Sequence, residues 1–297
     1  MNLCFHIARY LYKRKLAKQK KESSRGSSDE AYWRWQMETS TAYFRKFPSL
    51  YGEIEGKSVI DIGCGLGGRT CFLAKKGVTK ITGTDINHPE IEKARQLADK
   101  GLDPELRSRV EFKKVDEGKP QDNELYDVAL LIDSMEHVKD PTQMLNVAYD
   151  HLKPGGICYF STFGWYHHAA SHVRSIVPVP FATVFFSDRA ILNAVKRMLE
   201  EPFYQPSMWD SDPPIKRWEN VRSLQDRPGE HLNKYSISKF RKAMKASKFL
   251  EHMLHVEPFD SSKRPMLKVI NWLSKVPIIR EVYHSAIFGV LRKAPKC

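Results

Sequence analysis

Between residues 57 and 162, short apolar runs alternate with stretches in which apolar residues recur every three or four positions. The first pattern predicts buried strands and the second predicts amphipathic helices. Alternation of this kind predicts a doubly wound α/β fold with a mostly parallel sheet and ligands at the carboxyl ends of its strands. Predicted strands are 57–62, 79–85, 109–115, 126–132 and 156–162; predicted helices are 68–77, 89–100 and 140–152, and Lys153–Gly156 is a predicted turn.

The rest of the chain departs from this rhythm. Residues 31–50 are rich in aromatic side chains and predict one or two helices, which pack on the sheet or close over its ligand. Residues 163–235 are too long for a simple connection and predict an inserted lid or substrate region. A helix over 238–247, capped by a serine, and strands over 249–259 and 285–293 complete a seven-stranded, Rossmann-like sheet. We therefore expect one domain over 31–297, with 57–162, 163–235 and 236–297 as its parts, after an arm over 1–30.

Charge is concentrated at the two ends of the chain. The net charge is +13; residues 1–21 and 263–297 each contribute +7, so the remaining residues sum to −1. Both end segments also carry apolar residues at helical spacing, which favours contact with an anionic membrane surface over nucleic-acid binding; solvated charge is the alternative. A transit peptide within 1–28 also remains open.

Composition otherwise indicates an ordinary globular protein. The chain is 41% hydrophobic and 28% charged, and it has no apolar run of about 18 residues. Its five cysteines are scattered without metal-ligand spacing, which favours a reducing compartment. We expect a cytoplasmic location, with peripheral membrane contact as a further hypothesis.

The candidate ligand-binding segment follows the first predicted strand. The glycines of Gly63-x-Gly65-x-x-Gly68 let the backbone approach a ligand closely, and the helix that follows directs free N–H groups toward it. This spacing alone would permit a dinucleotide, with Asp85 on its ribose. Asp61 lies two residues before the first glycine, where its charge would repel a pyrophosphate. A cationic ligand without phosphate, such as S-adenosylmethionine, fits better, and a dehydrogenase is disfavoured.

At these positions the sequence resembles the class I S-adenosylmethionine-dependent methyltransferases. The resemblance covers roughly residues 57–162. The segments that carry it are Asp61–Gly67, Gly83–Ile86, Val115-Asp116, Tyr126–Ile132, Glu136–Val138 and Leu152–Gly156.

The resemblance implies a role for each of these cofactor-facing positions. Asp85 is expected to bind both ribose hydroxyls, and Asp116, with Glu117 beside it, the adenine amino group. Ile86 and Ile132 are expected to flank the adenosine or the loop near sulfur. The residues implied to hold the methionine end are Asp61, Gly63, Cys64, Gly65 and Gly67.

Three ionisable residues follow the fourth predicted strand. Asp133, Glu136 and His137 have the i, i+3, i+4 spacing that places side chains on one face of a helical turn. The surrounding segment is similar to the ubiquinone-biosynthesis O-methyltransferases, in which two Glu and one His hold a metal; here the first position is the shorter Asp133. Three interpretations stay open: a structural role, His137 with Glu136 as general base, or a divalent ion such as Mg²⁺ on all three.

The acceptor is the least defined part of the prediction. His167, His168 and His172 lie in the predicted insertion and could form a metal-ligand set or supply a second base, with a polar pocket wall or surface position as the alternative. His231 has the same open interpretations. We expect methyl transfer to a hydroxyl of a small-molecule, lipid-linked or glycan-like acceptor. The alternatives are N-, C- or RNA methylation, or a non-catalytic adenosylmethionine-binding scaffold at a membrane.

Overall fold

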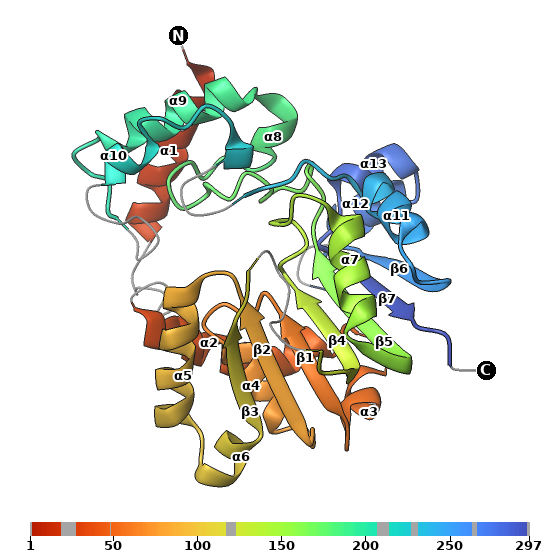
Figure 1. Cartoon of the computed structure of the whole chain (residues 1–297). Coiled ribbons are helices and arrows are strands. Elements are labelled where there is room, and N and C mark those ends of the chain that lie inside the picture. Colours follow the sequence, from red (N-terminus) through yellow and green to blue (C-terminus); the bar gives the residue numbers. More distant parts are fainter. Residues whose placement is uncertain are drawn as a thin grey trace.

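The computed structural model describes residues 2–18, 28–47, 49–116, 123–206, 214–226, 231–262 and 266–295. In these residues a single sheet of seven strands has the order β3-β2-β1-β4-β5-β7-β6. The strands from β1 to β5 pair in parallel, and β7 is antiparallel to both β5 and β6. The predicted doubly wound, mostly parallel fold is confirmed (Figure 1). The strands are β1 (Ser58–Ile62), β2 (Lys80–Asp85), β3 (Val110–Lys114), β4 (Tyr126–Ile132), β5 (Leu152–Thr162), β6 (Glu251–Glu257) and β7 (Ala286–Arg292).

Helices cover both faces of this sheet. One apolar core joins α2 and its neighbours to the sheet, and includes Trp33, Phe44 and Phe72. A second core lies on the other face, where Leu145 and Phe240 meet the strands. The helices of the first face are α2 (Asp29–Phe44), α3 (Leu50–Ile54), α4 (Gly68–Ala74), α5 (His88–Gly101) and α6 (Pro104–Ser108); those of the second are α7 (Pro141–Asp150) and α11 (Ile237–Ala246).

Local sequence signals set the starts of several of these helices. The side chains of Asn87, Asp140 and Ser236 each accept a hydrogen bond from a backbone N–H of the first turn. Pro89 and Pro141 occupy that first turn in α5 and α7, where the missing proline N–H is not needed. These helix starts agree with the sequence-based expectation.

The turn expected at Lys153–Gly156 is not a separate element. It lies inside β5 as an irregularity, because Tyr126 pairs with Leu152 while Val128 pairs with Ile157. Between these two pairs, four residues of β5 lie opposite one residue of β4, and Gly155 accommodates the bend with a φ of +79°. The strand begins at Leu152, which corrects the prediction that it begins at residue 156.

The insertion forms a third apolar core with the N-terminal helix. It contains α8 (Ala182–Phe185), α9 (Asp188–Leu199) and α10 (Pro214–Trp218). Helix α1 (Leu3–Lys18) packs against α9, and these helices group together away from the layers of the sheet (Figure 1). Residues of α1 that are buried in this core are Cys4, Phe5, Ala8 and Tyr12.

The burial of α1 revises what its sequence suggested. We expected a basic arm or a surface helix over residues 1–30, but the apolar side of its described part is used for internal packing. Arg9 pairs with Glu201, and the Arg197 guanidinium lies 3.7 Å from the centroid of the Phe5 ring. No helix in the described ranges combines the length and the apolar character that a membrane crossing requires.

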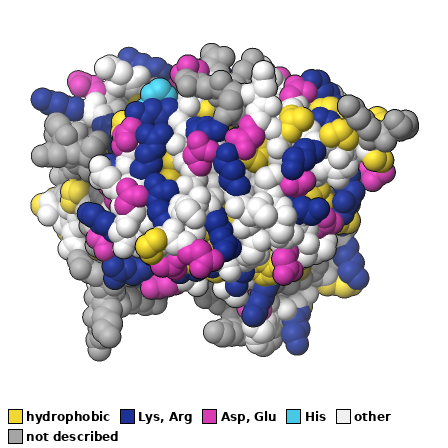
Figure 2. Space-filling model, turned by 60° about the horizontal axis from the view of Figure 1, so that its bottom comes forward, with side chains coloured by type: hydrophobic (Ala, Val, Ile, Leu, Met, Phe, Trp, Pro, Cys, Tyr) yellow, Lys and Arg dark blue, Asp and Glu magenta, His cyan; other side chains and the backbone are white. Residues whose placement is uncertain are grey.

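One face of the molecule carries charges of both signs. On the face shown in Figure 2, Lys and Arg side chains alternate with Asp and Glu rather than forming a patch of one sign. By contrast, the C-terminal helices α12 (Met266–Leu273) and α13 (Pro277–Val282) expose large apolar side chains, among them Trp272 and Ile278.

Candidate active site

The glycine loop joins β1 to α4 and turns sharply three times. Gly63, Gly65 and Gly67 have φ values of +80°, +53° and +73°, in the region that favours glycine. The N–H groups of Gly63 and Cys64 both donate to the Thr84 carbonyl oxygen, which fixes the loop on β2. A Cβ at Gly67 would lie 2.4 Å from Phe112 Cζ, so the start of α4 has no space for a side chain there.

Asp85 closes the loop from the neighbouring strand. Its two carboxylate oxygens accept hydrogen bonds from the backbone N–H groups of Gly65, at 2.9 Å, and Asn87, at 2.8 Å. The side chain of Ile86, next in sequence, is 63% exposed and leaves an apolar surface beside this carboxylate. Asp116 is exposed at the end of the following strand. Glu117 lies outside the described residues.

Other predicted cofactor residues are buried. Asp61 accepts a hydrogen bond from the Thr70 hydroxyl at 2.6 Å, and burial raises the pKa of its carboxyl to about 6. Cys64 is buried in the core. Ile132, expected to flank the adenosine, is packed in the same core, so its side chain is not presented as Ile86 is.

Asp133 belongs to a separate polar network. It accepts hydrogen bonds from Tyr43 Oη at 2.6 Å, Ser161 Oγ at 2.9 Å and Arg69 Nη1 at 2.8 Å. Burial alone would raise the pKa of this carboxyl, but the Arg69 charge and the two hydroxyl donors hold it below its usual range. Arg69 also lies over the Tyr43 ring, 4.1 Å from its centroid.

The network corrects the predicted metal set. Both oxygens of Asp133 are occupied by donors, and its backbone φ of +51° separates it from the turn that follows. Asp133, Glu136 and His137 are therefore not brought together on one helical face. Tyr43, Arg69 and Ser161 had no recognisable signal in the sequence because they come from α2, α4 and β5.

Glu136 and His137 do lie together. Glu136 is 3% exposed, accepts a hydrogen bond from Thr162 Oγ1 at 2.8 Å, and has its other oxygen 4.0 Å from His137 Nε2. Burial raises the pKa of the Glu136 carboxyl to about 7. His137 Nδ1 lies 3.0 Å from the His231 carbonyl oxygen. Because a carbonyl oxygen only accepts, Nδ1 carries the proton and Nε2 of the neutral ring keeps its lone pair.

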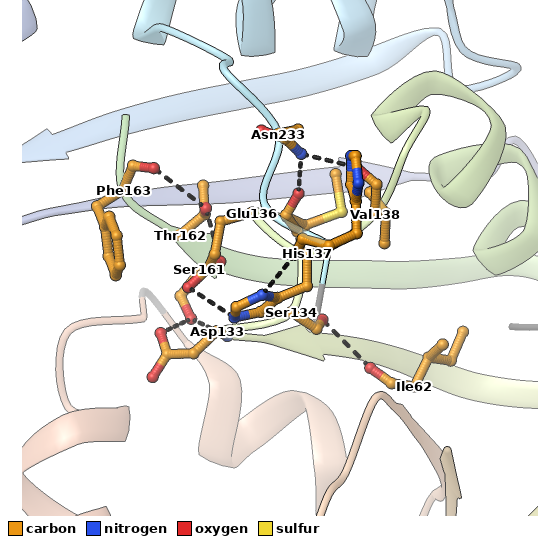
Figure 3. Close-up of polar contacts among 12 residues, drawn as sticks. Ile62, Asp133, Ser134, Glu136, His137, Val138, Ser161, Thr162, Phe163 and Asn233 are labelled. Carbon is orange, nitrogen blue, oxygen red and sulfur yellow. Dashed lines mark hydrogen bonds and ion pairs between the residues drawn. The ribbon is translucent and has the colours of Figure 1, made fainter. Parts of the chain in front are cut away.

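Asn233 holds this loop in place. Its side-chain amide donates to the carbonyl oxygens of Met135 and Val138, each at 2.8 Å, and its backbone N–H donates to that of Glu136. Figure 3 shows the loop between Asn233 and the end of β5. The predicted candidate His231 thus contributes through its backbone carbonyl, and Asn233 is a further residue of the site that sequence reasoning missed.

His172, rather than Asp133, lies beside Glu136 and His137. One ligand atom each from Glu136, His137 and His172 lies within 4.8 Å of the others, and the two imidazole rings meet edge to face at 4.9 Å. Two nitrogens and one oxygen do not fit Mg²⁺, which prefers oxygen ligands in octahedral geometry. We therefore derive no step through Mg²⁺.

A family model described as a methyltransferase domain matches residues 32–249, well over half of the chain. The chain belongs to this family. The predicted resemblance to the S-adenosylmethionine-dependent methyltransferases is confirmed by this match and by the fold.

Two curated relatives and one solved structure are similar to this methyltransferase. The chain is 29% identical over 168 residues to a ubiquinone biosynthesis O-methyltransferase of Hydrogenovibrio crunogenus, covering 56% of this chain and 64% of the relative. It is 34% identical over 110 residues to the same enzyme of Pseudomonas entomophila, covering 37% and 45%. The chain thus spans less than two thirds of either relative. A Haemonchus contortus phosphoethanolamine N-methyltransferase shares the fold, with a TM-score of 0.52, 17% identity, and coverage of 95% of this chain and 60% of that one.

The loop of this methyltransferase fits S-adenosylmethionine. The left-handed glycines keep side chains away from the ligand position, and exposed Ile86 offers an apolar contact for an adenine ring. Asp85 provides carboxylate oxygens at the end of β2. Because S-adenosylmethionine has no phosphate, the loop needs no cationic side chain to bind it. The cofactor, when bound, supplies an activated methyl group.

We predict that Glu136→Gln changes how stability depends on pH. A carboxyl whose pKa is raised on folding binds more protons in the native state, so stability falls as pH rises between its unfolded value and about 7. In urea unfolding of the ligand-free protein, variant and wild type should have similar stability at pH 5. At pH 8 the variant should be the more stable by roughly 1 kcal/mol or more. Parallel curves from pH 5 to pH 8 would contradict the burial argument.

Proposed function

We propose that this protein is an S-adenosylmethionine-dependent O-methyltransferase that acts on a hydroxyl of a small-molecule or lipid-linked acceptor. The observation that carries the proposal is the position of His137, whose tautomer leaves a basic nitrogen on the loop packed against the glycine loop. The names of the two curated relatives, both O-methyltransferases, support a hydroxyl acceptor.

In the proposed reaction His137 removes the acceptor's proton. As the acceptor oxygen bonds to the methyl carbon, the carbon–sulfur bond breaks and its electron pair stays on sulfur, which becomes a thioether. The hydroxyl proton passes to His137 Nε2, and the carboxyl of Glu136, 4.0 Å away, stabilises the imidazolium when ionised. The His231 carbonyl accepts from Nδ1 throughout and holds the ring in place.

The alternatives receive less support. A nucleic-acid substrate would favour a basic surface near the site, whereas residues 22–262, which include the site residues, carry a net charge of −1. A non-catalytic scaffold would leave the buried Glu136 and its hydrogen-bonded partners without a function, although burying a carboxyl is costly. Glycan-like acceptors remain compatible with a base that activates a hydroxyl.

We further propose that α12 and α13 contact an anionic membrane surface. Trp272 is 64% and Ile278 is 80% exposed, and the exposed Lys268 and Lys275 lie on the same two-helix segment. Exposed apolar side chains that alternate with lysines are complementary to the hydrocarbon and headgroups of an anionic bilayer. This surface would bring a lipid-linked acceptor close to the methyltransferase.

We predict that Asp85→Asn lowers the affinity for S-adenosylhomocysteine by about tenfold to a hundredfold, because hydrogen bonds to a charged group are lost. Isothermal titration calorimetry measures this, with Asp150→Asn, an exposed acid at the C-terminal end of α7, as the matched control. The wild type should bind S-adenosylhomocysteine more tightly than NAD. Tighter binding of NAD than of S-adenosylhomocysteine would contradict the methyltransferase proposal.

For His137→Gln we expect a loss of turnover of about 10²- to 10⁴-fold with cofactor affinity nearly unchanged, since a positioned base contributes on that scale. Transfer of labelled methyl groups from S-adenosylmethionine into a cell extract identifies an acceptor fraction for the assay. His151→Gln is the control, because His151 Nδ1 also faces a backbone carbonyl but lies after α7, outside the site. Full turnover by His137→Gln at saturating cofactor would exclude the base role.

The double variant Trp272→Ser with Ile278→Ser should bind phosphatidylglycerol vesicles about tenfold more weakly than wild type, through lost apolar contact. Vesicle sedimentation measures the binding. Leu250→Ser, an equally exposed apolar residue before β6, is expected to leave it unchanged. Equal binding by all three proteins would remove α12 and α13 from the membrane model.

A further inference from the structure

The first turns of the insertion contain buried polar atoms without partners. Within the described residues, His167 Nε2, His168 Nδ1, Ser171 Oγ and Arg174 Nε are buried and make no hydrogen bond. His167 is 4% exposed and Ser171 is 2% exposed. Each such atom costs roughly 1–3 kcal/mol when it is left unsatisfied. Four of them on eight consecutive residues indicate a site whose ligand completes the hydrogen bonds.

Three of these atoms can donate a hydrogen bond to a ligand: His167 Nε2, Ser171 Oγ and Arg174 Nε. His167 Nδ1 accepts a hydrogen bond from the Ala169 N–H at 3.3 Å, so the proton of the neutral ring is on Nε2. Burial keeps this ring neutral by lowering its pKa to about 2, and that of His168 to about 4. Ser171 Oγ–H and Arg174 Nε–H are donors as well. These three donors therefore have no acceptor among the described residues.

Arg174 adds an uncompensated positive charge. No ion pair or hydrogen bond of its guanidinium is found in the described part of the chain, and burial lowers its pKa. Arg174 follows His167 and His168 in the same run of turns after β5. After burial, its charge is a further cause that lowers the pKa of both rings. Arg174 is half-buried with its Nε buried, and a partly desolvated guanidinium of this kind is stabilised by an anion.

The cluster lies beside the candidate active site. A chain of ring contacts joins His137 to His167 through His172 and Phe163. The distances between successive ring centroids along it are 4.9, 5.1 and 4.8 Å. The His167 and His168 rings are 4.0 Å apart.

The far side of the cluster approaches the C-terminal helices. His284 follows α13, and its ring centroid lies 5.2 Å from that of His167. Its Nδ1 is hydrogen-bonded to the Arg280 carbonyl oxygen, and its Nε2 accepts a hydrogen bond from the Gly164 N–H. Phe181 contacts both His168 and Tyr283. The cluster therefore lies between the proposed base and the helices proposed to face the membrane.

We propose that His167, His168, Ser171 and Arg174 form a binding site for a phosphoryl group of the acceptor. Phosphoryl oxygens accept hydrogen bonds, and their negative charge would pair with the Arg174 guanidinium. A metal ion is excluded, because the guanidinium repels it and the His167 nitrogen that faces no partner is protonated. Only the assignment of this phosphoryl group to the acceptor rests on the proposed function; the binding of phosphate does not.

The test is calorimetric titration of the full chain with phenyl phosphate, carried out with saturating S-adenosylhomocysteine. Wild type should bind, and Arg174→Gln should weaken binding about tenfold or more, the effect of losing a charge-assisted hydrogen bond. Arg174→Lys should recover part of the affinity. Arg189→Gln, an exposed arginine of the same insertion, should match wild type.

The outcomes separate this inference from the methyltransferase proposal. If wild type binds S-adenosylhomocysteine but not phenyl phosphate at about 10 mM, or if Arg174→Gln binds phenyl phosphate as well as wild type does, the phosphoryl site is wrong and the cofactor site stands. A short-chain phosphatidate is the second probe. Tighter binding of phosphatidate than of phenyl phosphate assigns the phosphoryl group to a lipid-linked acceptor, and equal binding assigns it to a soluble phosphate ester.

Discussion

The candidate active site depends on how closely the loop after β4 approaches the glycine loop after β1. A Cβ at Gly63 would lie 2.8 Å from Ser134 Cβ, and the Ser134 hydroxyl donates to the Ile62 carbonyl at 3.3 Å. Only a glycine permits this contact with the φ of +80° that the turn requires. The cofactor loop and the loop that carries the proposed base are thereby fixed against each other, at the carboxyl ends of two adjacent parallel strands.

Two carboxylates of the loop after β4 have opposite environments. Asp133 is surrounded by donors and by Arg69, which keep it ionised, whereas Glu136 is buried with one hydroxyl donor and an imidazole, so its pKa rises. The difference arises from what β5, α2 and α4 place around each residue, and it separates a structural carboxylate from one suited to proton transfer. Asn233 then links this loop to the segment before α11.

The insertion connects the site to the ends of the chain. Its apolar core is completed by α1, so the N-terminal segment stabilises the region from which His167, His168 and Arg174 come. The first residues after β5 contribute the ring contacts beside His137, and Phe181 contacts Tyr283 after α13. The proposed acceptor site therefore combines parts of the chain that lie more than a hundred residues apart.

The sequence by itself determined the sheet, its helices and the cofactor loop. Local signals sufficed there: apolar periodicity gave the strands, Asn87 and Asp140 gave helix starts, and the spacing of Asp61, the glycines and Asp85 indicated the ligand. The tertiary structure alone decided what surrounds each side chain. Asp133 and Glu136 are three residues apart, yet their partners Arg69 and Thr162 come from other elements. Long-range packing places His172, rather than Asp133, beside Glu136 and His137. It also buries α1 and leaves donors without partners near Arg174. Periodicity and spacing along the sequence do not encode these contacts.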